Sequence, residues 1–121
     1  MVILLVEDHL AVRLGLKYFL EHYFLEDSKV KVEVIEAEDG KIAIKKIHER
    51  PDVDVIITDH IMPNMTGIEL VVWVKAHTQN IPIILHSTEE ITDDRHKADI
   101  FLIKGDVNTL TQALLKVHNK I

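Results

Sequence analysis

The sequence predicts a single α/β domain built on a five-stranded, doubly wound parallel sheet, with helices on both faces. The chain has 121 residues, which is enough for one domain with a substantial core. Five short apolar runs, rich in β-branched residues, alternate with segments of helical period, an order typical of parallel sheets. We therefore expect residues 1–121 to form one domain, with right-handed crossovers between the strands.

The first two strands and helices follow from apolar periodicity. Val2–Val6 is an uninterrupted apolar run, which suits a strand buried on both faces. Residues 10–25 have the spacing of a helix that is apolar on more than one side. Residues 30–37 alternate as a strand, and residues 41–50 are expected to form the second helix. The first helix has one apolar face of Val12, Leu16, Phe19, Leu20 and Tyr23, and a second stripe of Leu10, Leu14 and Tyr18.

The third strand is expected at residues 55–57, and it ends at Thr58-Asp59. The residues from Met62 to Gly67 are typical of a turn, and a helix is expected over residues 68–77. Because this helix contains several β-branched residues, packing is expected to hold it more than helix propensity does.

The last part of the chain contains two strands and one well-defined helix. Strands are expected at residues 81–86 and 100–103, and the segment Asp106-Val107-Asn108 can cap a helix over residues 109–120. Between the two strands, residues 89–99 are mostly polar. A fourth helix in that segment should therefore be short, tilted or partly unwound.

Charged and polar side chains stand at the ends of four of these strands. The carboxyl ends of parallel strands share one edge, and ligands of open α/β sheets bind there. Three acids packed together repel one another, and Mg²⁺ can balance them because it prefers carboxylate and carbonyl oxygens. With a lysine beside it, such a site is suited to a dianionic phosphoryl group. The residues are Glu7, Asp8, Asp59, Ser87 and Lys104.

These residues, together with Met62-Pro63 and Gly67, resemble the set that defines the receiver (CheY-like) domains of two-component response regulators. The resemblance covers essentially the whole chain and implies a flavodoxin-like fold. The segment from Val6 to His9, followed by Val12-Arg13 and Gly15-Leu16, is similar to the NarL/LuxR-type subfamily, whose receivers precede helix-turn-helix domains. No such output domain is present in these 121 residues.

The resemblance implies a phosphoacceptor signalling switch. Asp59 would accept a phosphoryl group from the phosphohistidine of a kinase. Asp8 would ligate Mg²⁺ directly and Glu7 mostly through water, while Asp59 and the Ile61 carbonyl would complete the protein ligands. Such a protein is not a turnover enzyme, although it would help to catalyse its own phosphorylation and dephosphorylation.

The resemblance also implies how the switch would work. Lys104 would pair with Asp59 before modification and with the phosphoryl oxygens afterwards. Ser87 would move its hydroxyl onto a phosphoryl oxygen, and Phe101 stands where the family has its switch aromatic. A phosphoryl group adds about two negative charges and three acceptor oxygens, which can bias such a two-state element.

The implied partners are a sensor histidine kinase or a histidine phosphotransfer protein, and downstream a protein target or a detached DNA-binding output domain. The stripe of Leu10, Leu14 and Tyr18 is where the family docks its kinase. The formal net charge of −6 argues against nucleic-acid binding by this chain. The N-terminal apolar run has no signal-peptide features and is too short to span a bilayer, so we expect a cytoplasmic protein.

The sequence departs from the family in two places. Lys104 precedes Gly105, where the family usually has proline in a cis peptide; a cis bond before a non-proline residue costs about 2.5–4 kcal/mol, so we expect a trans bond or a looser loop. Only 16 residues lie between Ser87 and Lys104, about one helical turn fewer than usual. The second departure affects the output surface more than the phosphorylation chemistry.

Simpler roles remain open for several of these residues. Asp59 or Ser87 could cap a turn, Phe101 could be core, and the stripe on the first helix could consist of ordinary exposed apolar residues. Three histidines flank the acids, and a zinc site is conceivable, but strand alternation favours histidines turned away from Asp59 and Ser87. A milder hypothesis is that protonation of His9 or His60 weakens Mg²⁺ binding. The three histidines are His9, His60 and His86.

Two other functions compete with the phosphoacceptor switch. A receiver-like interaction module would keep the fold and work without phosphorylation, and Gly105 with the short segment 89–99 leaves that possible. An Mg²⁺-dependent phosphatase with an aspartyl nucleophile fits poorly. It would need a second acid to protonate the leaving group, and Ile61 stands two residues after Asp59.

Overall fold

The computed structural model describes residues 1–22, 31–91 and 98–120, and these contain five strands and four helices. Strands and helices alternate as far as β4, which β5 follows as the next described element. This confirms the α/β class. The strands are β1 (Val2–Val6), β2 (Glu33–Ala37), β3 (Val55–Thr58), β4 (Ile83–Ser87) and β5 (Ile100–Ile103). The helices are α1 (Leu10–His22), α2 (Gly40–Glu49), α3 (Gly67–His77) and α4 (Val107–His118).

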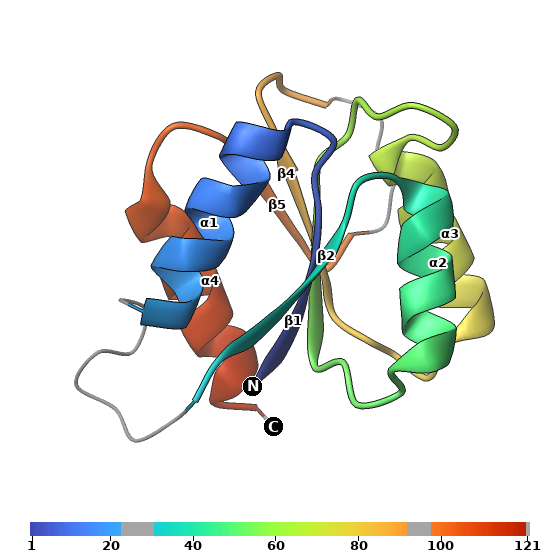
Figure 1. The fold of residues 1–121 in the computed structure, drawn as a ribbon, viewed down its shortest axis with the longest axis horizontal. Helices are drawn as coiled ribbons and strands as arrows, with labels where there is room; N and C mark the ends of the chain where they lie inside the picture. Colours follow the sequence, from blue (N-terminus) through green and yellow to red (C-terminus); the bar gives the residue numbers. More distant parts are fainter. Residues whose placement is uncertain (23–30, 92–97, 121) are drawn as a thin grey trace.

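All five strands are parallel and form one sheet in the order β2-β1-β3-β4-β5. The register brings the ends of most neighbouring strands level with one another: Val6 pairs with Ala37 and Thr58, and Ser87 pairs with Ile103. Strand β4 extends two residues further than β3, because Thr58 pairs with Leu85. Every strand therefore delivers its next residue to the same edge, which lies at the top of Figure 1. We call this edge the carboxyl rim.

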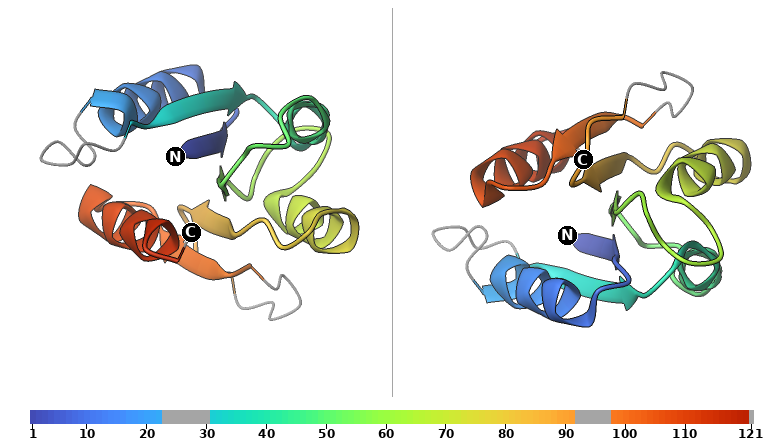
Figure 2. Two further views of the ribbon diagram at one scale, coloured as in Figure 1. Left: turned by 90° about the horizontal axis from the view of Figure 1, so that it is seen from below. Right: turned by 90° about the horizontal axis from the view of Figure 1, so that it is seen from above.

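The sheet separates two layers of helices, with α1 and α4 on one face and α2 and α3 on the other (Figures 1 and 2). Strand alternation divides the core accordingly. Ile3, Leu5 and Ile57 pack with α1 and α4, whereas Leu4, Val6 and Ile56 pack with α2 and α3. Complete burial of each such side chain stabilises the fold by about 1.5–3 kcal/mol, so the two apolar layers fix the orientation of every strand.

Three helices begin at side-chain caps. Asp39 accepts the Ile42 N–H at the start of α2. Thr66 and Glu69 form a reciprocal capping box at the start of α3. Asp106, the first of the three residues expected to cap the last helix, caps α4, which begins at Val107, two residues earlier than expected. Such caps satisfy N–H groups that have no partner within the helix.

The element boundaries differ from the expectation in small ways. Strand β2 begins at Glu33, and β4 begins at Ile83, after Pro82. Val12 is exposed and does not belong to the inward face of α1. The expected helical residues 23–25 and most of the expected fourth helix, residues 92–97, lie outside the described residues; the flanking residues 88–91 and 98–99 are not helical.

None of the helices in the described ranges is both long enough and apolar enough to cross a membrane.

Candidate functional site

Asp59 is held at the carboxyl rim by the backbone on both sides of it. Its N–H donates to the Val6 carbonyl at 3.0 Å, which continues the β1–β3 ladder by one residue. The His60 carbonyl then accepts the Gly67 N–H at 2.7 Å, which closes the loop between β3 and α3. A Cβ at Gly67 would overlap the Asp59 carbonyl oxygen and would lie 2.8 Å from the His60 Cα. Glycine at position 67 is therefore a condition for this loop to pack.

The same loop is tied to α2. Asn64, in the left-handed conformation with φ of 68°, donates from its amide to Asp39 Oδ2 at 3.0 Å. The hydrogen bond from the Ile42 N–H contributes most to lowering the pKa of Asp39, and the hydrogen bond from Asn64 lowers this pKa further. Asp39 therefore caps α2 and anchors the loop that follows Asp59. This role was not predicted, although the turn Glu38-Asp39-Gly40 before an apolar helix was a signal for the cap.

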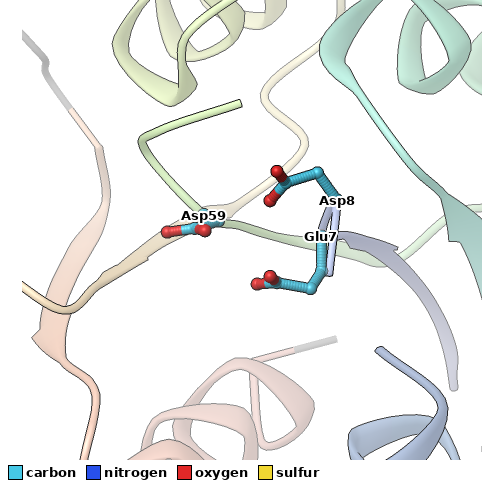
Figure 3. A group of neighbouring side chains, drawn as sticks. All are labelled: Glu7, Asp8 and Asp59. Carbon is cyan, nitrogen blue, oxygen red and sulfur yellow. The ribbon is translucent and has the colours of Figure 1, made fainter. Parts of the chain in front are cut away.

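Three carboxylates gather at the ends of β1 and β3 (Figure 3). Glu7, Asp8 and Asp59 each offer an oxygen, and these oxygens lie within 4.8 Å of one another. Glu7 is buried, Asp59 is partly buried and Asp8 is exposed. Across the described ranges, this is the one group of three or more acidic or histidine side chains that could hold a metal ion. The structure thus places side by side three of the residues that the sequence analysis assigned to the ends of neighbouring strands.

Lys104 lies against this cluster. Its Nζ is 2.7 Å from Glu7 Oε2 and 3.4 Å from Asp59 Oδ2. The resemblance had implied Asp59 as its partner in the unmodified protein, but the closer partner is Glu7. The Glu7 side chain is 4% exposed, so its charge has the least access to water and gains most from a nearby ammonium.

One ammonium among three carboxylates leaves the cluster negative, and the donor set is composed of hard oxygen ligands. Such a set fits Mg²⁺, which is bound through one or a few carboxylates and retains waters. Ile61 lies two residues after Asp59 in the loop, with its side chain 62% exposed. Its carbonyl as a metal ligand remains a prediction.

Ser87 is buried at the end of β4, and its Oγ accepts the Glu89 N–H at 3.2 Å. It therefore caps the turn after β4, as the simpler alternative proposed. The Ser87 carbonyl accepts the Lys104 N–H at 2.7 Å. The backbone that carries Ser87 is thus bonded directly to the backbone that carries Lys104.

Phe101 is partly buried on β5, opposite Leu85 of β4, and its role as a switch remains a prediction. The Lys104-Gly105 peptide is trans, which is one of the two expected outcomes. Gly105 has φ of 152°, a conformation that residues with a side chain rarely adopt, and a Cβ there would have no neighbour within 4 Å.

Within the described ranges, no histidine belongs to the group of side chains that could hold a metal ion. The His9 ring nitrogen Nδ1 accepts a hydrogen bond from the Val12 N–H at 3.4 Å, at the start of α1. The lone pair of this nitrogen is therefore already used. His60 has a buried Nδ1 that finds no hydrogen-bond partner among residues 1–22, 31–91 and 98–120. His86 is buried as well, and burial, followed by the positive charge of Lys104, lowers its pKa to about 4. Asp59 acts on it in the opposite direction, so His86 lies within electrostatic range of the site.

The stripe on α1 faces solvent. Leu10, Leu14 and Tyr18 are 58%, 48% and 57% exposed. A face with three large apolar side chains at helical spacing is suited to contact with a partner. Its role remains a prediction.

Two hollows lie elsewhere on the molecule. One, of about 630 Å³, runs between β5 and α4 and includes Ile100 and Lys116. The other, of about 550 Å³, surrounds Trp73 and the rings of His48 and His77. Their linings contain none of the three acids, so the chemistry of the rim does not take place in either hollow.

Residues 3–113 match the response regulator receiver domain. The chain belongs to this family. Receiver domains are the phosphoacceptor switches of two-component signalling systems, and this receiver therefore has that function. The predicted family and fold are confirmed.

Among its relatives, the receiver is 38% identical over 91 residues to chemotaxis protein CheY1 of Helicobacter pylori strain J99, covering 74% of this chain and 68% of the relative. It is 39% identical over 85 residues to histidine kinase P4 of Formosa agariphila, covering 69% of this chain and only 6% of the kinase. It is 28% identical over 125 residues to the response regulator VraR of Staphylococcus saprophyticus, covering 97% of this chain and 56% of VraR.

The fold is shared with the response regulator TrrA of Thermotoga maritima, whose crystal structure is a complex with Mg²⁺ and BeF. The TM-score is 0.84 at 27% identity, and the match covers 96% of this receiver and 97% of TrrA. Similarity to LuxR-type regulators extends to a solved structure from Staphylococcus aureus, with a TM-score of 0.80 at 21% identity, which concerns the fold alone.

Proposed function

We propose that Asp59 is the phosphoacceptor of this receiver and that Glu7, Asp8 and Asp59 bind the Mg²⁺ that the transfer requires. One observation supports this most strongly. Three carboxylates from two strands meet within 4.8 Å, and the Lys104 ammonium lies 3.4 Å from the carboxylate of Asp59. An anionic nucleophile, a cation site and a fixed positive charge are the components that phosphoryl transfer needs.

In the proposed transfer, an oxygen of the Asp59 carboxylate attacks the phosphorus of a phosphohistidine. A P–O bond forms, the P–N bond breaks, and the released imidazole nitrogen takes a proton from solvent. Asp8, Glu7, Asp59 and the Ile61 carbonyl would hold Mg²⁺, which neutralises charge on the phosphoryl oxygens when it is bound. The chain would thus contribute to its own phosphorylation, and to its own dephosphorylation by water.

Lys104 and Ser87 would provide the response to the new group. The Lys104 ammonium now pairs with two carboxylates, and a phosphoryl oxygen on Asp59 would compete for it. The Ser87 hydroxyl would have to release the Glu89 N–H in order to turn towards the phosphoryl group. That movement alters the turn after β4, and Phe101 on the neighbouring strand would respond to the change.

The proposed upstream partner is a sensor histidine kinase or a histidine phosphotransfer protein, which would contact the exposed stripe of Leu10, Leu14 and Tyr18 on α1. This stripe follows directly after the acidic end of β1, so a partner bound there is beside the site. The downstream partner would be a protein target or a separate DNA-binding output domain.

The test is phosphorylation of the whole chain by acetyl phosphate with Mg²⁺, measured by intact mass. Wild-type protein should gain one phosphoryl group, and Asp59→Asn should gain none. Asp52→Asn is the matched control, because Asp52 is an exposed acid before β3 and pairs with Arg50. No adduct on wild type, or an adduct that persists in Asp59→Asn, would contradict the proposal. Unmodified wild type that still binds its partner would support the phosphorylation-independent module instead.

A further inference from the structure

Arg13 connects the acidic end of β1 to the rest of the fold. It lies in the first turns of α1, and its side chain is 13% exposed. Its Nη1 donates to the Glu7 carbonyl at 2.8 Å, and its Nε donates to Glu36 Oε1 at 3.1 Å. One guanidinium therefore holds the main chain beside the acids and a carboxylate on β2 at the same time.

The bond to the Glu7 carbonyl has a direct consequence for Asp8. The peptide group between Glu7 and Asp8 is planar, so the direction of the Glu7 carbonyl also sets the position of the Asp8 nitrogen and Cα. Asp8 itself is exposed and follows the last residue bonded to β2, since the Glu7 N–H donates to the Ala37 carbonyl at 3.0 Å. Arg13 is thus the side chain that fixes the peptide on which the exposed acid is carried.

Glu36 makes this clamp rigid. It belongs to β2, it accepts from Arg13 through one oxygen, and its other oxygen is 3.5 Å from Lys17 Nζ. A guanidinium with two directed bonds has little freedom to rotate, which is the geometry that distinguishes arginine from lysine. Lys17 shares the carboxylate of Glu36, whereas the bond to the Glu7 carbonyl comes from Arg13.

We propose that Arg13 is a positioning residue of the metal site: it orients the Glu7-Asp8 peptide so that the Asp8 carboxylate meets that of Asp59. This inference rests on the proposed Mg²⁺ site. Groups that orient metal ligands without touching the metal typically change metal affinity by about 10–100-fold when they are removed.

Because Arg13 is positively charged, the direction in which its loss changes the Mg²⁺ dissociation constant tests the inference. A positive charge near a cation site disfavours the cation, so its loss should tighten Mg²⁺ binding if only long-range electrostatics matter. Loss of a positioning bond should weaken Mg²⁺ binding. The two explanations therefore predict opposite changes in the dissociation constant.

The experiment is Mg²⁺ titration of the whole chain by calorimetry, with Arg13→Met, Arg13→Lys and the control Lys17→Met. Arg13→Met and Lys17→Met remove one positive charge each, and both remove a partner of Glu36. We expect about tenfold weaker binding or more in Arg13→Met, partial recovery in Arg13→Lys, and equal or slightly tighter binding in Lys17→Met. An Arg13→Met variant that binds Mg²⁺ as tightly as Lys17→Met would overturn the proposal.

A second measurement separates this inference from the metal site itself. Amide hydrogen exchange in the metal-free protein should be faster at Glu7, Asp8 and His9 in Arg13→Met than in Lys17→Met. If wild type and Asp8→Asn bind Mg²⁺ equally, the metal site is wrong, and the exchange data still decide whether Arg13 orients the peptide. Unchanged exchange at these three amides in Arg13→Met would also reject the proposal.

Discussion

The two loops that bring Asp59 and Lys104 together are built in different ways. The loop from β3 to α3 is fixed by its backbone: Gly67 packs against the Asp59 carbonyl, a capping box starts the next helix, and Asn64 is bonded to Asp39. The turn from β5 to α4 has an open glycine, and the Lys104 side chain is held by two ion pairs. Asp59 is therefore placed by packing, whereas the Lys104 ammonium beside it is placed by charge.

The difference indicates which part of the site can respond to a new anion. A charge on Asp59 changes little in a loop whose shape depends on close contacts. The same charge competes directly for the Lys104 ammonium, which already serves two carboxylates. We therefore expect the response to begin on the side of β4 and β5, where the Ser87 carbonyl and the Lys104 N–H are bonded.

The largest effect should come from Gly67, and Gly105 provides the comparison in the other loop. Gly67→Ala places a Cβ against the backbone of Asp59 and His60, which can make room only if the whole loop shifts. The substitution should lower the free energy of unfolding by about 3 kcal/mol and reduce phosphorylation of Asp59. Gly105→Ala meets an unfavourable φ but no neighbour, and it should cost about 1 kcal/mol. Urea unfolding of both variants measures the contrast, and equal losses would show that the two loops are constrained alike.

Removal of Lys104 should have the next largest effect. Lys104→Met leaves the buried Glu7 carboxylate without its ammonium, which should lower the free energy of unfolding by about 2 kcal/mol in the absence of metal. Mg²⁺ should restore much of this loss, because a cation among the acids replaces the missing charge. Unfolding with and without Mg²⁺ measures the recovery; a variant that Mg²⁺ stabilises no more than it stabilises wild type would contradict this account.

His86 reports the electrostatics on the lysine side. Burial and the charge of Lys104 lower its pKa to about 4, below the unfolded value of about 6.5. Between these two pH values the unfolded chain binds a proton at His86 and the folded chain does not, so stability falls as the pH decreases from 6.5 to 4. Relative to pH 7, this site should cost about 1–2 kcal/mol at pH 5.

The comparison that isolates this effect is wild type against His86→Leu. Leucine fills the buried position with a side chain of similar size that is apolar and cannot be protonated. As the pH decreases through this range, wild type should therefore lose unfolding free energy relative to His86→Leu. A difference that stays constant from pH 7 to pH 4 would show that His86 is protonated equally well in both states.

The smallest effect concerns the caps of the helices that follow the two loops. Thr66→Ala removes one half of a reciprocal box and should cost about 1 kcal/mol, whereas Asp106→Ala removes a single bond and should cost about 0.5 kcal/mol. Thermal and urea unfolding can resolve this difference if the two variants are measured together. A larger loss at Asp106 would mean that the turn after β5 contributes more order than its contacts indicate.

Much of the fold could be predicted because its strands are continuous apolar runs. Ile56 and Ile57 are buried on opposite faces of the sheet. A short run that is apolar on both sides is typical of a central strand of a parallel sheet covered by helices on both faces. The end of β3 then fixes where Asp59 emerges. The order of the strands in the sheet was not predicted, because alternation along the chain does not specify which strands are neighbours.

The finer geometry of the site depended on information that spacing does not contain. Two acids could pair with Lys104, and side-chain burial decides in favour of Glu7. Gly67 could be recognised as part of a turn, but its packing against the Asp59 carbonyl follows only from the folded loop. Val12 has the correct spacing for the core and is nevertheless 38% exposed, because the inward face of α1 is narrower than its apolar surface.

The fluorescence of Trp73 can report on the C-terminal half of α3. It is the only tryptophan in the sequence, and its indole stacks on the imidazole of His77 with ring centroids 4.7 Å apart. It lies six residues after Gly67, which corresponds to about 9 Å along the helix axis. A change in its emission on addition of Mg²⁺ or beryllofluoride would therefore report a displacement transmitted along the helix, and unchanged emission would show that α3 remains stationary while the rim changes.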